Sequence, residues 1–108
     1  MKQTGNEDRF VQALKGTQYI VINTCYGGYG LSELALERYR HYTGSATDSY
    51  HDIPRDDPML VKVVYELGSD AYGGYAKLKV VEVPGNVEWQ IEEHDGNEWV
   101  AEVHRTWS

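Results

Sequence analysis

The chain has 108 residues, of which 41% are hydrophobic and 25% charged, and this composition predicts one globular domain rather than a disordered chain or two domains around a cleft. Ten basic residues against seventeen acidic ones give a formal net charge of −7, which argues against polymeric nucleic acid as a partner but leaves room for a small anionic ligand in a locally positive pocket. The single cysteine, Cys25, excludes an internal disulfide, and there is neither a membrane-length apolar run nor a signal peptide, so we expect a soluble cytoplasmic protein with no membrane partner.

The first half of the chain predicts a strand followed by a helix. Residues 1–18 are expected to be an N-terminal extension, partly helical or frayed, and residues 19–108 a single α+β domain. Residues 19–23 are nearly all apolar, which is typical of a central strand covered on both faces. After a glycine loop, a helix is predicted over residues 32–43, with Ser32 as its N-cap.

A second helix is predicted over residues 58–67, after the sequence Pro-Arg-Asp-Asp-Pro. Asp57 is expected to cap this helix, Pro58 to take its first position, and Gly68 to end it. A second glycine pair, flanked by tyrosines, follows at residues 72–75 and indicates a turn.

The C-terminal third changes to a period of two, which is typical of strands. Residues 77–105 predict a three-stranded antiparallel meander, with Asp95-Gly96 as a strong hairpin signal. Joined to the strand at 19–23, the meander predicts one four-stranded, mostly antiparallel sheet that carries the two helices.

The glycine loop between the first strand and helix is a candidate anion site. Gly27 and Gly28 allow a ligand to approach the backbone, and a helix N-terminus favours negative charge. Tyr26 and Tyr29 offer aromatic faces of the kind that line a pocket for a base or a sugar. The spacing matches neither the dinucleotide fingerprint nor the P-loop, and a tight turn without a ligand is the simpler interpretation.

Two arginines and a tryptophan complete the candidate binding set. Arg105 can hold a phosphate through two hydrogen bonds, and Trp107 offers a stacking face for a nucleobase. Arg55 is a further basic candidate, and its alternative role is an ion pair with Asp56, Asp57 or a neighbouring chain. Arg105 and Trp107 have alternative roles as an ion-pair partner and as a cover for the sheet.

Catalysis and metal binding find weaker support. Cys25 precedes a helix, where a thiol can become nucleophilic, but one cysteine and four scattered histidines occur by chance in many domains. The histidines lack a ligand spacing, and helix capping explains Asp56 and Asp57 better than a catalytic role. We therefore expect no catalytic residue, no metal and no cofactor.

Three blocks of the sequence resemble a family of small tailed-phage proteins: NTCYGGYGLSELA, PRDDPMLVKVVYELG and VEWQIEEHDGNEWVAEVHRTW. The resemblance covers Tyr19 to Trp107, and the family is identified with the viral anti-CBASS sponges, which act against cyclic-oligonucleotide antiphage signalling. It implies a homo-oligomer, in the cytoplasm of the infected bacterial host, that binds a cyclic dinucleotide such as 3′,3′-cyclic GMP-AMP without cleaving it. The positions then expected to contact the ligand are Tyr26, Gly27, Gly28, Tyr29, Arg55, Arg105 and Trp107.

Two other functions remain open from the sequence. One is an acidic phage protein that binds and inhibits a host defence protein, for which the net charge of −7 is the relevant feature. The other is a cysteine-dependent hydrolase, in which Cys25 would be essential.

Overall fold

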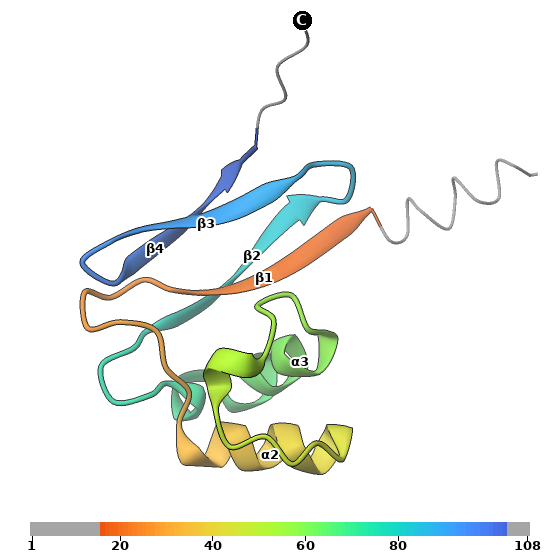
Figure 1. The fold of residues 1–108 in the computed structure, drawn as a ribbon, viewed down its shortest axis with the longest axis vertical. Coiled ribbons are helices and arrows are strands. Elements are labelled where there is room, and N and C mark those ends of the chain that lie inside the picture. The colour runs from red at the N-terminus through yellow and green to blue at the C-terminus, as the bar shows by residue number, and fades with distance from the viewer. Residues whose placement is uncertain (1–15, 104–108) are drawn as a thin grey trace, which may run out of the picture.

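The computed structural model describes residues 16–103, so most of the expected N-terminal extension at residues 1–18 lies outside the described part of the chain, while residues 17 and 18 belong to the first strand. Figure 1 shows the helices beneath the strands. The elements follow in the order β1 (Thr17–Asn23), α2 (Glu33–Thr43), η1 (Tyr50–Asp52), α3 (Pro58–Leu67), η2 (Gly68–Ala71), β2 (Leu78–Pro84), β3 (Trp89–His94) and β4 (Asn97–Glu102), where η marks a 3-10 turn.

Both helices begin and end where the capping residues predicted. The Ser32 hydroxyl accepts a hydrogen bond from the amide three residues later, and Gly44 ends α2 with a φ of 72°. The Asp57 carboxylate accepts from the first amides of α3, Pro58 occupies the first turn, and Gly68 follows the last residue. The α+β class and the two predicted helices are therefore confirmed.

The strands form two antiparallel pairs instead of one sheet. β1 pairs with β2, and β3 pairs with β4, so the predicted four-stranded sheet was wrong. β2 and β3 do not pair, and the turn between them is held by a hydrogen bond from the Val87 amide to the Pro84 carbonyl. The side chain of Gln18 in β1 donates to the carbonyls of Pro84 and Val87. The β3–β4 hairpin is thereby free to fold across the face of the β1–β2 pair.

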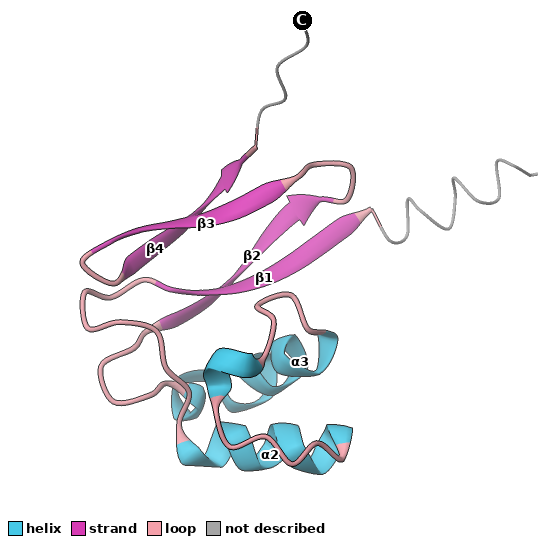
Figure 2. Ribbon diagram, viewed as in Figure 1, coloured by secondary structure: helices cyan, strands magenta, loops and turns pink. Residues whose placement is uncertain are grey.

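The two apolar faces of β1 explain why the β3–β4 hairpin covers the β1–β2 pair. Val21 packs with the helices, whereas Ile20 and Ile22 face a second cluster that contains Trp89 and Val100 of the hairpin. All three β1 side chains are buried, as expected for a strand covered on both faces. A single sheet with helices on one face would leave Ile20 and Ile22 in water, and the hairpin provides their cover. The result is three layers, which Figure 2 shows as helices, the β1–β2 pair and the β3–β4 hairpin.

Candidate functional site

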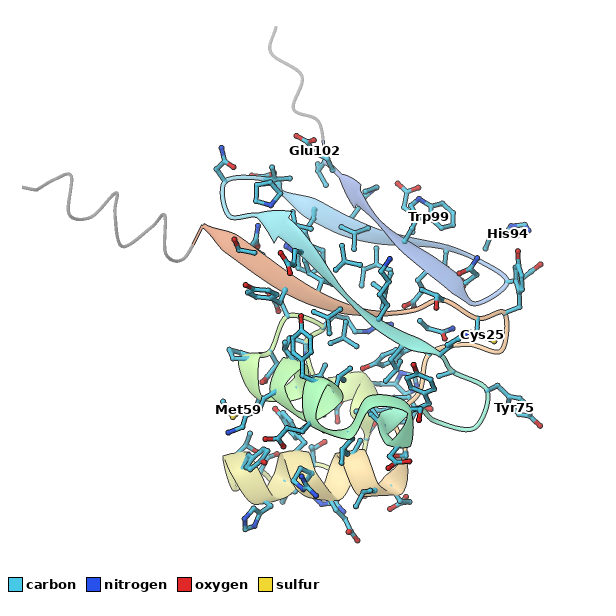
Figure 3. All side chains as sticks on the ribbon, turned by 180° about the vertical axis from the view of Figure 1, so that it is seen from behind. Cys25, Met59, Tyr75, His94, Trp99 and Glu102 are labelled. Atoms are coloured by element: carbon cyan, nitrogen blue, oxygen red, sulfur yellow. The ribbon has the colours of Figure 1, made fainter. Side chains whose placement is uncertain are left out.

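Three loops meet at one end of the molecule, and we call residues 24–30, 72–77 and 94–97 the loop end. Their backbones touch: a Cβ added to Gly27 would lie 2.1 Å from Cβ of Tyr75, one added to Gly73 2.7 Å from the backbone of Gly30, and one added to Gly96 2.7 Å from the Gly28 amide. Figure 3 shows the first, second and third of these loops together through the labelled Cys25, Tyr75 and His94. Close packing between loops therefore accounts for several of the glycines.

A buried asparagine at the end of β1 holds the three loops together. The side-chain nitrogen of Asn23 donates to the carbonyls of Cys25 (2.6 Å) and Gly96 (2.7 Å), and its side-chain oxygen accepts from the Lys77 amide at 2.8 Å. The side chain is completely buried, so each of these bonds replaces one to water. Asn23 was not among the residues predicted from the sequence, in which it is marked only as a polar residue at the end of an apolar strand.

The surface of the loop end has a shallow hollow and two exposed tyrosines, of which Tyr75 lines the hollow and Tyr26 lies between two lining residues, Cys25 and Gly27. Tyr26 is 68% exposed and Tyr75 is 80% exposed, which is unusual for such large aromatic side chains. The hollow has a volume of about 450 Å³ and is lined by Cys25, Gly27, Tyr72, Gly74, Tyr75, Ala76 and Lys77. Lys77 supplies a cation, and the tyrosine rings supply flat apolar faces. This surface can bind a ligand with planar rings or the side chains of another protein.

The guanidinium of Arg55 is bound inside the fold. It makes a two-point ion pair with Glu98 at 2.8 and 2.9 Å, donates to the Val21 carbonyl at 3.1 Å, and lies 3.5 Å from the centre of the Tyr29 ring. An ion pair was one of the two roles predicted for Arg55, although the partner is 43 residues away instead of being Asp56 or Asp57. A phosphate could reach this group only by displacing Glu98.

Tyr29 also belongs to the interior, unlike its neighbour Tyr26. Its ring packs edge-on against Tyr50 with 5.7 Å between ring centres. Its hydroxyl is buried and has no hydrogen-bond partner in the described structure. Burial raises the pKa of Tyr29 to about 12, although the nearby charge of Arg55 acts in the opposite direction. The two tyrosines of the first glycine loop are thus separated, with only Tyr26 on the surface.

The chain just before α2 is held by η2 and by the first residue of the second loop. Ser32 donates its amide to the Ala71 carbonyl and its hydroxyl to the Asp70 carbonyl, and Leu31 forms an isolated bridge with Tyr72. Gly28 adopts a φ of 97°, which requires glycine for conformational reasons. These contacts match the tight-turn interpretation of the first glycine loop.

The remaining candidates lie apart or outside the described residues. Arg105 and Trp107 are beyond residue 103, so the structure does not place them. Cys25 is half-buried, and no hydrogen bond joins its thiol to a histidine of residues 16–103. Within the same range no group of three or more acidic, histidine or cysteine side chains could hold a metal ion. No helix there is long and apolar enough to cross a membrane.

Comparisons of this chain with protein-family models, with curated proteins and with solved structures found no match. Function is therefore inferred from the geometry of the loop end and the chemistry of its side chains.

Proposed function

We propose that this chain sequesters a nucleotide signal of the cyclic dinucleotide class, without cleaving it, on the surface of the loop end. The observation that carries the proposal is a hollow of about 450 Å³ lined by the exposed Tyr75, with a second exposed tyrosine, Tyr26, between two of its lining residues, Cys25 and Gly27. Stacking of a base on an aromatic side chain contributes about 1–3 kcal/mol to binding, and each base of a cyclic dinucleotide can stack on one tyrosine.

The candidate residues for contact with a phosphate differ from those expected from the sequence. Arg55 is already paired with Glu98, so Lys77 at the edge of the hollow becomes the first basic candidate. Glu93 and Asp95 lie on the hairpin that meets the first glycine loop, and their charge opposes an anionic ligand. Stacking must therefore supply a large share of the affinity, and a second cation must come from elsewhere.

We infer that Arg105 supplies that cation from a second copy of the chain. β4 starts beside the loop end, and Val103 lies at the other end of the hairpin, where its amide bonds to Glu88. At the rise of a strand, Val103 is about 20 Å from the start of β4. Two further residues extend the chain by at most about 7 Å, too little to return to the hollow. A site that combines Tyr75 with Arg105 would therefore be shared between subunits, in line with the proposed homo-oligomer.

The test is a thermal-shift panel with cyclic dinucleotides, cyclic trinucleotides and linear mononucleotides, followed by chromatography of the recovered ligand. One cyclic nucleotide should raise the melting temperature and be recovered intact. Tyr75→Ala and Tyr26→Ala should each weaken its binding by about 5-fold to 150-fold, which corresponds to the stacking energy of one base. Tyr65→Ala removes a tyrosine of α3 that is 58% exposed and should leave binding unchanged.

Recovery of a cleaved nucleotide would replace sequestration with hydrolysis, and the next variant would then be Cys25→Ala. Light scattering with and without the ligand tests the shared site, because a strictly monomeric complex of full affinity would contradict it.

A protein partner is the second candidate, and the acidic residues of the loop end favour it. Tyrosines are enriched at protein interfaces, and Asp95 and Glu93 would attract a basic surface such as that of a host defence protein. This candidate predicts that no nucleotide changes the melting temperature. It also predicts that Asp95→Lys slows association with the partner, whereas in the nucleotide model the same change would strengthen binding.

A further inference from the structure

The outer edge of β1 is closed along only part of its length. On the side away from β2, the Val21 amide donates to the Arg55 carbonyl at 2.9 Å, and the Val21 carbonyl accepts from the Arg55 guanidinium. Two residues later, the Asn23 amide donates to the Glu98 carboxylate at 2.8 Å. The edge from Val21 to Asn23 therefore has its hydrogen bonds satisfied by Arg55 and Glu98.

Within the described residues, the same edge has unpaired backbone groups at Tyr19 and Thr17, two and four residues before Val21. Backbone groups of an antiparallel strand alternate in direction, so Tyr19 and Thr17 point the same way as Val21, away from β2. The residue opposite Thr17 is Pro84, which has no N–H to offer, while the Gly85 amide bonds to Gly16 one position along. Within residues 16–103 no hydrogen bond reaches these outward groups of Thr17 and Tyr19.

A groove runs along this open edge. It has a volume of about 330 Å³ and is lined by Thr17, Gln18, Tyr19, Asp56, Pro58 and Val61. Pro58 and Val61 belong to the start of α3 and form an apolar floor, and Tyr19 is 40% exposed beside them. The exposed carboxylate of Asp56 has no ion-pair partner among the described residues.

We propose that this groove is a docking site for an extended peptide with a basic side chain, which adds to β1 as an outer strand. Outward backbone groups, an apolar floor and one carboxylate are the three parts of a strand-addition site. The charge of the groove selects the occupant: pairing with the β1 edge of a second copy would bring two Asp56 carboxylates together, whereas a lysine-bearing or arginine-bearing segment neutralises Asp56.

The site is separate from the loop end. Residues 17–19 lie at the start of β1, and the loop end begins after its last residue, Asn23. Peptide docking is therefore independent of nucleotide binding, and either activity can fail without the other.

The test uses the full chain labelled with ¹⁵N and titrated with the peptide Ac-Val-Lys-Val-Lys-Val-NH₂. The amide signals of Thr17, Tyr19 and Val61 should shift in a saturable way, and signals of residues 72–77 should not. Ac-Val-Glu-Val-Glu-Val-NH₂ should bind at least tenfold more weakly. A version of the lysine peptide that is N-methylated at alternate residues should also lose at least tenfold, because it cannot donate to the outward carbonyls.

Two variants test the edge and the charge separately. Tyr19→Pro removes an outward N–H without breaking the β1–β2 ladder, and Asp56→Lys reverses the charge of the groove. Each should abolish saturable binding of the lysine peptide, whereas Asp52→Lys, at an exposed carboxylate of η1, should retain it. Circular dichroism is used to check that each variant is folded. The titration of the unaltered chain tests the proposal even if a variant fails to fold.

Equal binding of the methylated and unmethylated peptides would overturn the proposal, because docking would then not use the backbone. Slow hydrogen exchange at the amides of Thr17 and Tyr19 in the free chain would also overturn it, because the edge would already be occupied.

Discussion

Replacement of one partner of the buried Arg55–Glu98 pair should destabilise the protein strongly. The side chains of Arg55 and Glu98 are 22% and 9% exposed, so Arg55→Met leaves a nearly buried carboxylate with the Asn23 amide as its remaining donor. Loss of one partner of a buried pair costs about 3–5 kcal/mol, and the partial exposure of Arg55 places this pair near 3 kcal/mol. For a domain of this size the melting temperature should fall by about 12–24 °C.

A double-mutant cycle separates the pair from the two side chains that form it. Urea unfolding of Arg55→Met, Glu98→Gln and the double variant gives the coupling energy, and the double variant should be clearly more stable than the sum of the single changes predicts. The matched control is Arg38–Glu66, a single contact of 3.3 Å between side chains that are 36% and 35% exposed. Its coupling should be much smaller, because water screens an exposed pair.

A coupling energy of Arg55 with Glu98 no larger than that of Arg38 with Glu66 would refute a strongly stabilising buried pair. In that case the position of the guanidinium over the Tyr29 ring, at 3.5 Å, would have to account for any effect of Arg55→Met. The variant Tyr29→Leu in the Glu98→Gln background would then measure that contribution directly.

Three further predictions concern single residues. The pKa of Tyr29 is raised from 10.0 to about 12 in the folded state, so its contribution to the free energy of unfolding is complete below pH 10 and is lost as the pH rises through 12. Urea unfolding between pH 9 and 12.5 should show a loss of about 2–3 kcal/mol in the free energy of unfolding. The variant Tyr29→Phe should lack this loss, and equal pH dependence of the two proteins would refute the prediction. Gly27→Ala places a Cβ against the second loop and should cost about 1–3 kcal/mol in urea unfolding, whereas Gly74→Ala meets open space and should be harmless; equal effects would show that the loops are not packed as described. Asp57→Ala removes the cap of α3 and should cost about 1–2 kcal/mol, so an unchanged melting temperature would contradict its capping role.

Local signals in the sequence were sufficient for the helices and for the environment of β1. Ser32, Asp57 and Pro58 act within a few residues of their own positions, so their effect can be recognised without the fold. The apolar run at Ile20, Val21 and Ile22 likewise predicted a strand covered on both faces. The pairing of strands failed because a hairpin that folds over a sheet has the same period of two as a strand that joins it.

The candidate site was predictable only in part, because its contacts join distant segments. Arg55 was recognised as either a ligand or an ion-pair residue, but its partner Glu98 is 43 residues away in a strand rich in carboxylates. Tyr26 and Tyr29 are equivalent in sequence, yet one is on the surface and the other is under a guanidinium. Asn23 was missed because its hydrogen bonds reach residues 54 and 73 positions further along the chain.

The apolar character of β1 on both faces means that hydrophobic burial does not determine its register. If the strand slipped by one residue, Ile20 and Val21 would exchange faces and apolar side chains would still fill both layers. Such a slip would instead take Asn23 away from three loop contacts and Val21 away from Arg55. In this protein the apolar residues stabilise the strand, and the polar groups at its edge select one alignment from several of similar hydrophobic energy.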